Sequence, residues 1–249
     1  MDCDSLSEVR QGSDSLQYFG DLTTRIHPSW YPVFDEAYQE LDDIARRLQE
    51  DEERGDTIYP AKEDLFRPFL LTSLDDVKCV IVGQDPYSHG EGNGVAFSAP
   101  KKEQPPVSLE VIWAALKEAG YTIPTRCTLE GWCAQGVLLV NKSFTVKKDR
   151  PGSYFQRWDG LWYYVAKALN CQKRTIAWCF WGREARELEV RCQSKYKFTT
   201  CHPAADRRAR QTGAPHTFEG HLHFASVNKI LIKHGIEPIR WGQTEPVQS

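Results

Sequence analysis

The order of apolar and polar positions predicts a helical N-terminal portion followed by alternating strands and helices. Apolar residues recur at helical spacing from Phe34 to Leu48, and the acidic run at residues 50–53 ends this helix near Gly55. Short β-branched runs predict four strands, at Lys78–Val82, Val137–Val140, Thr175–Trp181 and Lys195–Thr200. Helical spacing predicts four further helices, at Leu109–Ala119, Phe155–Leu169, Glu184–Val190 and Phe218–His234.

The predicted strands are apolar on both faces, which is typical of a sheet covered by helices on two sides. We therefore expect an α/β fold with a central, mostly parallel four-stranded sheet flanked by helices. The chain has no internal repeat and no change of composition after residue 60, so residues 21–249 are expected to form a single domain. Residues 1–20 are rich in Ser, Asp, Gln and Gly, and are expected to form a mobile N-terminal segment.

Polar residues stand at the points where the predicted strands end. Asp85 follows the first strand, Asn141 the second and His202 the fourth, while the third runs into Gly182 and Arg183. In an open α/β sheet, ligands bind beyond the carboxyl ends of the strands. Asp85, Asn141 and His202 are therefore expected to converge on one cleft, although they are far apart in the sequence.

The composition suits a packed enzyme of 249 residues, with 41% hydrophobic residues. The net charge is −3, but residues 1–60 carry −10 and the remainder carries +7. A basic body is compatible with a DNA-facing surface, although a solvated acidic helix and an ordinary surface account for these charges equally well.

Several classes of site and location are not expected. No apolar run approaches the roughly 20 residues that span a bilayer, and the acidic N-terminus lacks a secretion signal pattern. The eight cysteines are expected to be reduced, with Cys79 and Cys179 as small core residues. No pair has the C-x-x-C spacing, and no His/Cys cluster has zinc-ligand spacing, so we expect neither a metal nor another cofactor.

Four motifs occur in a fixed order along the chain: GQDPYSHGEGNGVAFS, VLLVNKSFTV, WGREA and HPAADRRAR. In order and spacing they resemble the family-1 uracil-DNA glycosylases, over a region from about Ile58 to Trp241. The resemblance implies a monomeric hydrolase of the uracil-DNA glycosylase fold that flips uracil out of DNA. It would cleave the N-glycosidic bond and leave an abasic site for base excision repair.

The resemblance also implies two catalytic residues. Asp85 would stabilise the positive charge that develops on the deoxyribose and orient the attacking water. His202 would act as a neutral donor to uracil O2, with a depressed pKa. The alternatives are an Asp that caps the turn before Pro86 and a His that is an ordinary loop residue.

Four residues would bind the base. Asn141 would accept from uracil N3–H and donate to O4, a pair that cytosine presents in reverse. Tyr87 would exclude the thymine methyl group, Phe97 would stack on the ring, and Gln84 would add polar contacts. Tyr87 and Phe97 could instead be ordinary core aromatics.

The residues expected to contact DNA are those that align with the family's phosphate-binding loops. They are Ser88, Ser108, Gly182, Arg183 and Ala204. Ser88 departs from the family, which usually has His directly after GQDPY.

A second departure follows His202, where the family's Ser-Pro-Leu is replaced by Ala204 and a longer arginine-rich segment. The missing leucine normally fills the gap left by the flipped base. Our hypothesis is that Arg207, Arg208 or Arg210 fills it by planar stacking, the alternative being a solvated basic loop. The divergent loops also resemble those of glycosylases from large DNA viruses.

Three other functions are compatible with an α/β fold: an accessory factor, a glycosylase of different specificity and an unrelated nucleotide-binding enzyme. A DNA-binding replication accessory or processivity factor of the same fold, with secondary catalysis, is disfavoured by the intact Asp85, Asn141 and His202. A glycosylase for mismatched thymine or damaged bases is disfavoured by Asp85 with Tyr87, and no nucleotide-binding glycine motif follows any strand. The expected partners are uracil-containing DNA, single- or double-stranded, and a proteinaceous inhibitor, and the expected location is the host nucleus or else the cytoplasm.

Overall fold

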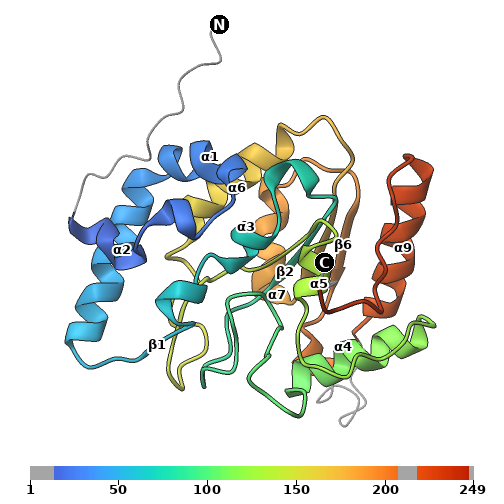
Figure 1. Cartoon of the computed structure of the whole chain (residues 1–249), viewed down its shortest axis with the longest axis horizontal. Helices are drawn as coiled ribbons and strands as arrows, with labels where there is room; N and C mark the ends of the chain where they lie inside the picture. The colour runs from blue at the N-terminus through green and yellow to red at the C-terminus, as the bar shows by residue number, and fades with distance from the viewer. Residues whose placement is uncertain (1–13, 207–217, 247–249) are drawn as a thin grey trace, which may run out of the picture.

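The computed structural model describes residues 14–206 and 218–246, and a four-stranded parallel sheet lies at its centre (Figure 1). The strands are β2 (Cys79–Gly83), β3 (Val137–Asn141), β5 (Ala177–Trp181) and β6 (Lys197–Thr200). Their order is β3-β2-β5-β6, and all neighbours are parallel. Each predicted strand is present with ends shifted by at most two residues, so the predicted fold class is confirmed.

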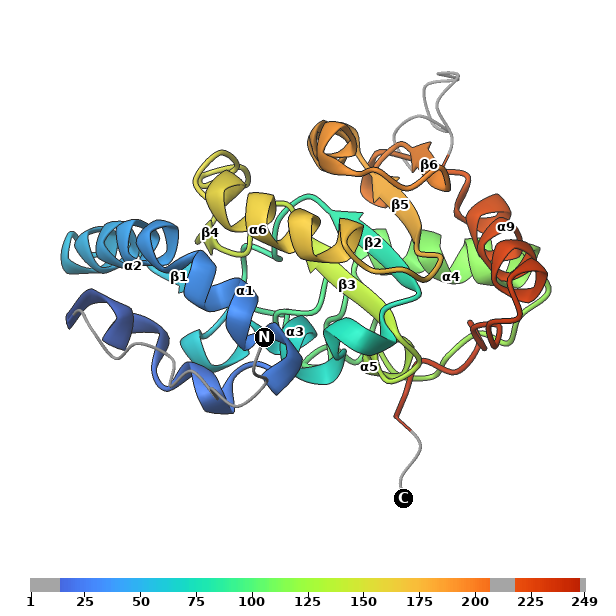
Figure 2. The ribbon, with the colours of Figure 1, turned by 90° about the horizontal axis from the view of Figure 1, so that it is seen from above.

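Helices cover both faces of the sheet (Figures 1 and 2). Successive strand residues point to opposite faces, so Val80 and Val82 join one core while Cys79 and Ile81 join the other. The first core also takes residues from α1 (Tyr31–Glu36), α2 (Tyr38–Glu53), α3 (Arg67–Leu71) and α6 (Asp159–Asn170). The second takes residues from α4 (Val107–Glu118), α5 (Glu130–Cys133) and α9 (Gly220–Lys233).

The structure divides two of the helices that were predicted as continuous. The helix expected from Phe34 to Leu48 is interrupted at Ala37, yet Phe34, Ala37 and Leu41 are all buried. The apolar spacing continues across the break, and for that reason the pattern could not reveal it. The helix expected at Glu184–Val190 is α7 (Arg183–Arg186) followed by a 3-10 helix, Glu187–Arg191.

The third difference is the start of α6, which was expected at Phe155 but begins at Asp159. The backbone N–H of Phe155 donates to Gly152 and that of Arg157 to Tyr154, both three residues back. This bonding belongs to turns rather than to an α-helix.

Part of the expected mobile N-terminal segment is folded. Asp14–Phe19 forms a 3-10 helix, and the Phe19 ring is buried edge-to-face against Phe66 at 5.2 Å. The Tyr18 hydroxyl donates to Glu52 of α2 at 3.2 Å. Two aromatic side chains thus pack this segment against the rest of the protein, and the boundary expected at residue 20 stays a prediction. Residues 1–13 lie outside the described part of the chain.

A small antiparallel sheet of β1 (Ile58–Tyr59) and β4 (Val146–Lys147) was not predicted. Two-residue strands are too short to give a periodic pattern. This sheet joins the segment after α2 to the turn that follows β4.

Within the described ranges, no helix has both the length and the apolar character needed to cross a membrane. In the same residues, no group of three or more His, Cys, Asp or Glu side chains is arranged to hold a metal ion. The seven cysteines in these ranges are free, and Cys79 and Cys179 are buried in the second core as expected.

Candidate active site

The site lies where β2 and β3 end side by side. Gly83 pairs with Asn141 in the sheet register, and the Gln84 carbonyl accepts from the Ser143 N–H at 3.0 Å. A Cβ at position 83 would lie 2.4 Å from Asn141 Oδ1 and 2.9 Å from the Phe97 ring. Only glycine fits there, and its absent side chain lets the Asn141 amide stand directly beside the GQDPY loop.

A cavity of about 290 Å³ opens at this edge of the sheet. Asp85, Asn141 and His202 all line it, as their positions at strand ends led us to expect. The other predicted site residues on its wall are Gln84, Tyr87, Ser88, Phe97, Ser108 and Ala204. The folding of the sheet therefore gathers nine of the predicted residues into one place.

Asp85 is held by a main-chain donor. The Gly152 N–H donates to Asp85 Oδ2 at 2.7 Å. Burial raises the pKa of Asp85 to about 6, opposed by this hydrogen bond and reinforced by the negative charge of Glu184. Asp85 is therefore ionised at neutral pH, but only by a small margin.

His202 is held in one tautomer. The Ala204 N–H donates to His202 Nδ1 at 3.2 Å, so the neutral ring carries its proton on Nε2. Burial lowers the pKa of His202 to about 4, against the opposing effect of Glu184. The ring is therefore neutral at pH 7 and can donate from Nε2.

Tyr87 is fixed in the wall by two hydrogen bonds. Its hydroxyl donates to the Phe97 carbonyl at 3.0 Å and lies 2.7 Å from Ser108 Oγ, which then donates in return. Burial raises the pKa of Tyr87, so the phenol stays protonated. Ser108 was expected to contact a phosphate, but here it is 4% exposed and its hydroxyl is engaged with Tyr87. Its role at DNA stays a prediction.

Phe97 is both a core residue and a pocket residue. It is 6% exposed, and its ring lies 5.4 Å from Trp181 and 5.6 Å from His202, centroid to centroid. Its φ of 63° is unusual for a residue with a large side chain. Strained backbone of this kind persists where the surrounding packing fixes it, and it is common at binding sites.

The side-chain amide of Asn141 lines the cavity and forms no hydrogen bond with any other residue that the structure describes. Asn141 is nevertheless only 4% exposed. Its carbonyl oxygen and NH₂ group are thus both available to a molecule in the cavity. A planar ligand with one donor beside one acceptor would satisfy both.

The remaining predicted residues lie on the rim. Gly182 and Arg183 line a neighbouring hollow of about 600 Å³, which shares Gln84 and His202 with the first cavity. The Arg183 side chain is 89% exposed. Arg207, Arg208 and Arg210 lie outside the described residues, so the stacking hypothesis for them stays a prediction.

Two residues at the site were not found from the sequence. Gly152 acts through its main-chain N–H, which carries no signal of residue type. Glu184 affects the pKa of both Asp85 and His202, yet in the sequence it is one acidic residue in a charged helix. Its place directly after the Gly182-Arg183 strand end was the available clue.

A family model described as Uracil DNA glycosylase superfamily matches residues 71–230, more than half of the chain. The chain belongs to the uracil-DNA glycosylase superfamily. A uracil-DNA glycosylase from Amoebophilus asiaticus is 33% identical over 231 residues, covering 88% of this chain and 100% of the relative. One from human herpesvirus 7 is 34% identical over 230 residues, covering 89% of each.

Solved glycosylase structures share the fold. The crystal structure of mimivirus uracil-DNA glycosylase superposes with a TM-score of 0.78 at 22% identity, covering 90% of each chain. A variant of mimivirus UNG in complex with UGI gives 0.79 at 23% identity, covering 90% of this chain and 92% of that one. The fold of this superfamily member is therefore that of the solved enzymes.

Membership of the glycosylase superfamily settles the class of reaction. The chain is a hydrolase of N-glycosyl bonds that excises uracil from DNA in base excision repair. The alternative of a replication accessory factor is not favoured by these relatives. Bacterial and viral glycosylases match at similar identity, so the expected viral origin stays a prediction.

Proposed function

We propose that this chain excises uracil by placing an ionised carboxylate and a neutral imidazole in one cavity, with Asp85 and His202 as the catalytic pair. The observation that carries the proposal is that both groups line one cavity, where the Gly152 N–H holds Asp85 and the Ala204 N–H holds His202 with its proton on Nε2. Burial penalises the charged form of each, so near pH 7 Asp85 is an anion and His202 a neutral donor. These two states assist a cleavage that leaves a cationic sugar and an anionic base.

In the proposed step the bond between C1′ and uracil N1 breaks first, and its electron pair leaves with the base. The sugar becomes cationic, and the carboxylate of Asp85 stabilises it. The negative charge spreads onto uracil O2, where the Nε2–H of His202 strengthens its hydrogen bond. A water oriented by Asp85 adds its oxygen to C1′, and the released proton passes to the carboxylate and then to solvent.

Base selection would come from the opposite wall. The Asn141 oxygen would accept from uracil N3–H and its NH₂ would donate to O4, while cytosine would leave both groups mismatched. The Tyr87 ring, held by Phe97 and Ser108, would occupy the space that a 5-methyl group needs. Phe97 would stack on the base, and Gln84 would add polar contacts.

The nucleotide must leave the duplex to reach this cavity, at a cost of a few kcal/mol. The side chains of Ser88 and Arg183 are proposed to hold the flanking phosphates. Gly182 and Ala204 would lie beside them, because their main-chain N–H groups already donate to Thr200 and His202. Arg207, Arg208 or Arg210 would fill the gap in the stack. The protein would act as a monomer on single- or double-stranded DNA, and the UGI complex of the mimivirus relative supports a proteinaceous inhibitor as a further partner.

The test is an excision assay with chelator present, on oligonucleotides that carry one uracil, cytosine, thymine or mispaired thymine. Abasic product is expected from the uracil strand alone. Asn141→Asp should lower uracil excision, because the carboxylate cannot donate to O4, and should admit some cytosine by accepting from its N4 amino group. No product from the uracil strand would overturn the proposal, and equal cleavage of thymine would overturn the role of Tyr87.

A further inference from the structure

The turn that supplies the Gly152 N–H is held only weakly by its own backbone. It spans residues 147–154, after β4, and Pro151 at its apex lines the cavity. Inside the turn, the Arg150 N–H donates to Lys147 at 3.0 Å and the Ser153 N–H to Arg150 at 3.2 Å. Residues 148–151 are exposed. Two main-chain bonds to other segments fasten the first half of the turn, from the Lys148 N–H to Thr57 at 2.8 Å and from the Asp149 N–H to Ser88 at 3.2 Å. The direction of the Gly152 N–H, in the second half, therefore depends on how the far end of the turn is fixed.

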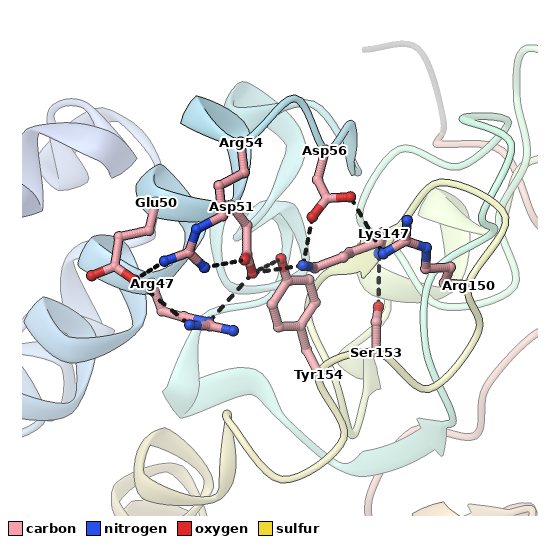
Figure 3. Close-up of polar contacts among 9 residues, drawn as sticks. All are labelled: Arg47, Glu50, Asp51, Arg54, Asp56, Lys147, Arg150, Ser153 and Tyr154. Atoms are coloured by element: carbon pink, nitrogen blue, oxygen red, sulfur yellow. Dashed lines mark hydrogen bonds and ion pairs between the residues drawn. The ribbon is translucent and has the colours of Figure 1, made fainter.

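A network of charged and hydroxyl side chains joins both ends of this turn to the end of α2 and to the segment that follows it (Figure 3). At the start of the turn, Lys147 Nζ lies 2.6 Å from Asp56 Oδ2 and 3.0 Å from Asp51 Oδ2. At its end, the Tyr154 hydroxyl donates to the same Asp51 oxygen at 2.8 Å. The two ends of the turn therefore meet at one carboxylate. The Ser153 hydroxyl closes the loop by accepting from the Lys147 N–H at 2.8 Å.

The meeting point is buried. Asp51 is 1% exposed and the Lys147 side chain 14%. Burial raises the pKa of Asp51, but hydrogen bonds from Lys147 and Tyr154 outweigh it and the pKa lies below the usual value. Arg47 of α2 and Arg54, the residue that follows α2, also reach this carboxylate, at 3.4 and 3.5 Å. A buried ionised group must keep its partners in place, so the network resists displacement of the turn.

From this arrangement we infer that Asp51 is a positioning residue for Asp85. Through Lys147 and Tyr154 it holds the turn so that the Gly152 N–H stays directed at Asp85 Oδ2, 2.7 Å away. The inference deepens the proposed function and rests on the role of Asp85 in it. By this inference, a residue near the C-terminal end of α2 contributes to catalysis through Asp85, although no residue of α2 lines the cavity.

The simpler alternative is that the network only fastens α2 to β4 and so adds stability. The titration of Asp85 separates the two. Because the Gly152 hydrogen bond lowers the pKa of Asp85, loss of that bond raises it. Removal of the negative charge of Asp51 without movement of the turn would have the opposite sign, because it can only lower the pKa of Asp85.

The other groups that face Asp85 and Asp51 stay unchanged in this comparison. The charged or titratable side chains that line the two adjoining cavities with Asp85 are Tyr87, Arg183, Glu184, Arg186, Cys201, His202 and Glu219. His202 is neutral above about pH 4. Around Asp51 the remaining charged groups are Arg47, Glu50, Arg54, Asp56, Lys147 and Arg150. None of them is altered by the substitutions below.

The experiment follows the carboxyl carbon of Asp85 by NMR as the pH is changed, in the full-length protein, with Asp85→Asn to assign the signal. Asp51→Asn should raise the midpoint by roughly half a pH unit or more. Tyr154→Phe, which keeps every charge, should raise it by less. The matched control is Asp43→Asn, the same change on the same helix at a side chain that is 74% exposed and pairs with Arg46. It should leave the midpoint unmoved.

Uracil release under single-turnover conditions is the second readout. Asp51→Asn should slow the chemical step several-fold near pH 6 and leave KM unchanged, because binding groups are untouched. A midpoint equal to or below that of the unsubstituted protein, with only Tm reduced, would overturn the inference. If Asp51→Asn does not fold, the titration midpoint of Asp85 in Tyr154→Phe decides: a raised midpoint supports the inference, and an unchanged or lower one overturns it. The titration needs no turnover, so a raised midpoint without any uracil release would refute the proposed function alone.

Discussion

The two groups proposed as the catalytic pair, Asp85 and His202, are held in different ways. His202 takes its hydrogen bond from Ala204, two residues further along the chain, so its tautomer is set within one loop. Asp85 accepts its hydrogen bond from the N–H of Gly152, 67 residues away in the sequence. The turn that contains Gly152 is itself bonded to α2, through Tyr154 and Asp51. The tautomer of His202 is thus set locally, whereas the hydrogen bond to Asp85 comes from a distant part of the sequence.

Burial acts on both walls and has opposite consequences. It penalises the charged form of each group, so the pKa of Asp85 rises to about 6 and that of His202 falls to about 4. Above pH 6 the cavity therefore contains one anion and one neutral donor. A single low-dielectric pocket can thus give Asp85 its ionised state and His202 its neutral state, provided that the protein works at a pH above both pKa values.

The largest expected effect is that of Asp85→Asn, which keeps the shape of the side chain and removes its charge. Single-turnover uracil release should fall by about 10³–10⁴-fold, because the sugar cation loses its stabilising anion. DNA binding, measured by anisotropy with the same oligonucleotide, should change little. A loss of less than tenfold would mean that the charge at this wall is not used.

His202→Gln should have the next largest effect, a loss of about 10²–10³-fold, because one donor to the departing base is removed. Glutamine can still offer a misplaced N–H, so the loss should be smaller than that for Asp85. His234→Gln, at an exposed histidine bonded to Tyr196, is the control and should retain full activity. Equal losses at positions 202 and 234 would contradict the assignment.

The third prediction concerns pH: kcat/KM should fall about tenfold for each pH unit below the pKa of Asp85. Asp85 must be ionised, so kcat/KM should be constant above its pKa and fall as the pH drops through about 6. Glu184→Gln removes a negative charge that raises this pKa, so the acid limb should move to lower pH. A limb that moves upward in this variant would contradict the proposed effect of Glu184 on Asp85.

The smallest effect concerns stability. Because the folded-state pKa of Asp85 is raised, ionisation penalises the folded protein, and this penalty grows as the pH rises from the unfolded-state value of 3.8 to about 6. Asp85→Asn should therefore raise Tm by roughly 2–6 °C near pH 7.5, and by much less near pH 4.5. Scanning calorimetry at both pH values tests this, and an equal shift at both would show that charge is not the cause.

The same contrast explains what the sequence could predict. The strands were found because each is a short apolar run bounded by polar or glycine residues, and parallel strands bring their carboxyl ends together. Asp85, Asn141 and His202 follow those ends directly, so their shared cavity could be predicted without knowledge of the loops.

The support of Asp85 could not be predicted in this way. Gly152 contributes a main-chain N–H, and Tyr154 meets Asp51 across 103 positions of sequence. The run at residues 50–53 could be recognised as acidic, but its pattern did not distinguish the buried Asp51 from its solvated neighbours. The break at Ala37 was hidden for a related reason, because the buried spacing is the same with or without it.

The pair of Tyr87 and Ser108 has a consequence for redesign of the pocket toward larger bases. Truncation of Tyr87 alone would make room for a bulkier base, but it would strand the buried hydroxyl of Ser108 and the Phe97 carbonyl without their partner. A smaller, apolar residue at position 108 would relieve part of that cost. The proposed exclusion of larger bases by Tyr87 is therefore coupled to position 108, and a screen that varies both positions should find a wider substrate range than one that varies Tyr87 alone.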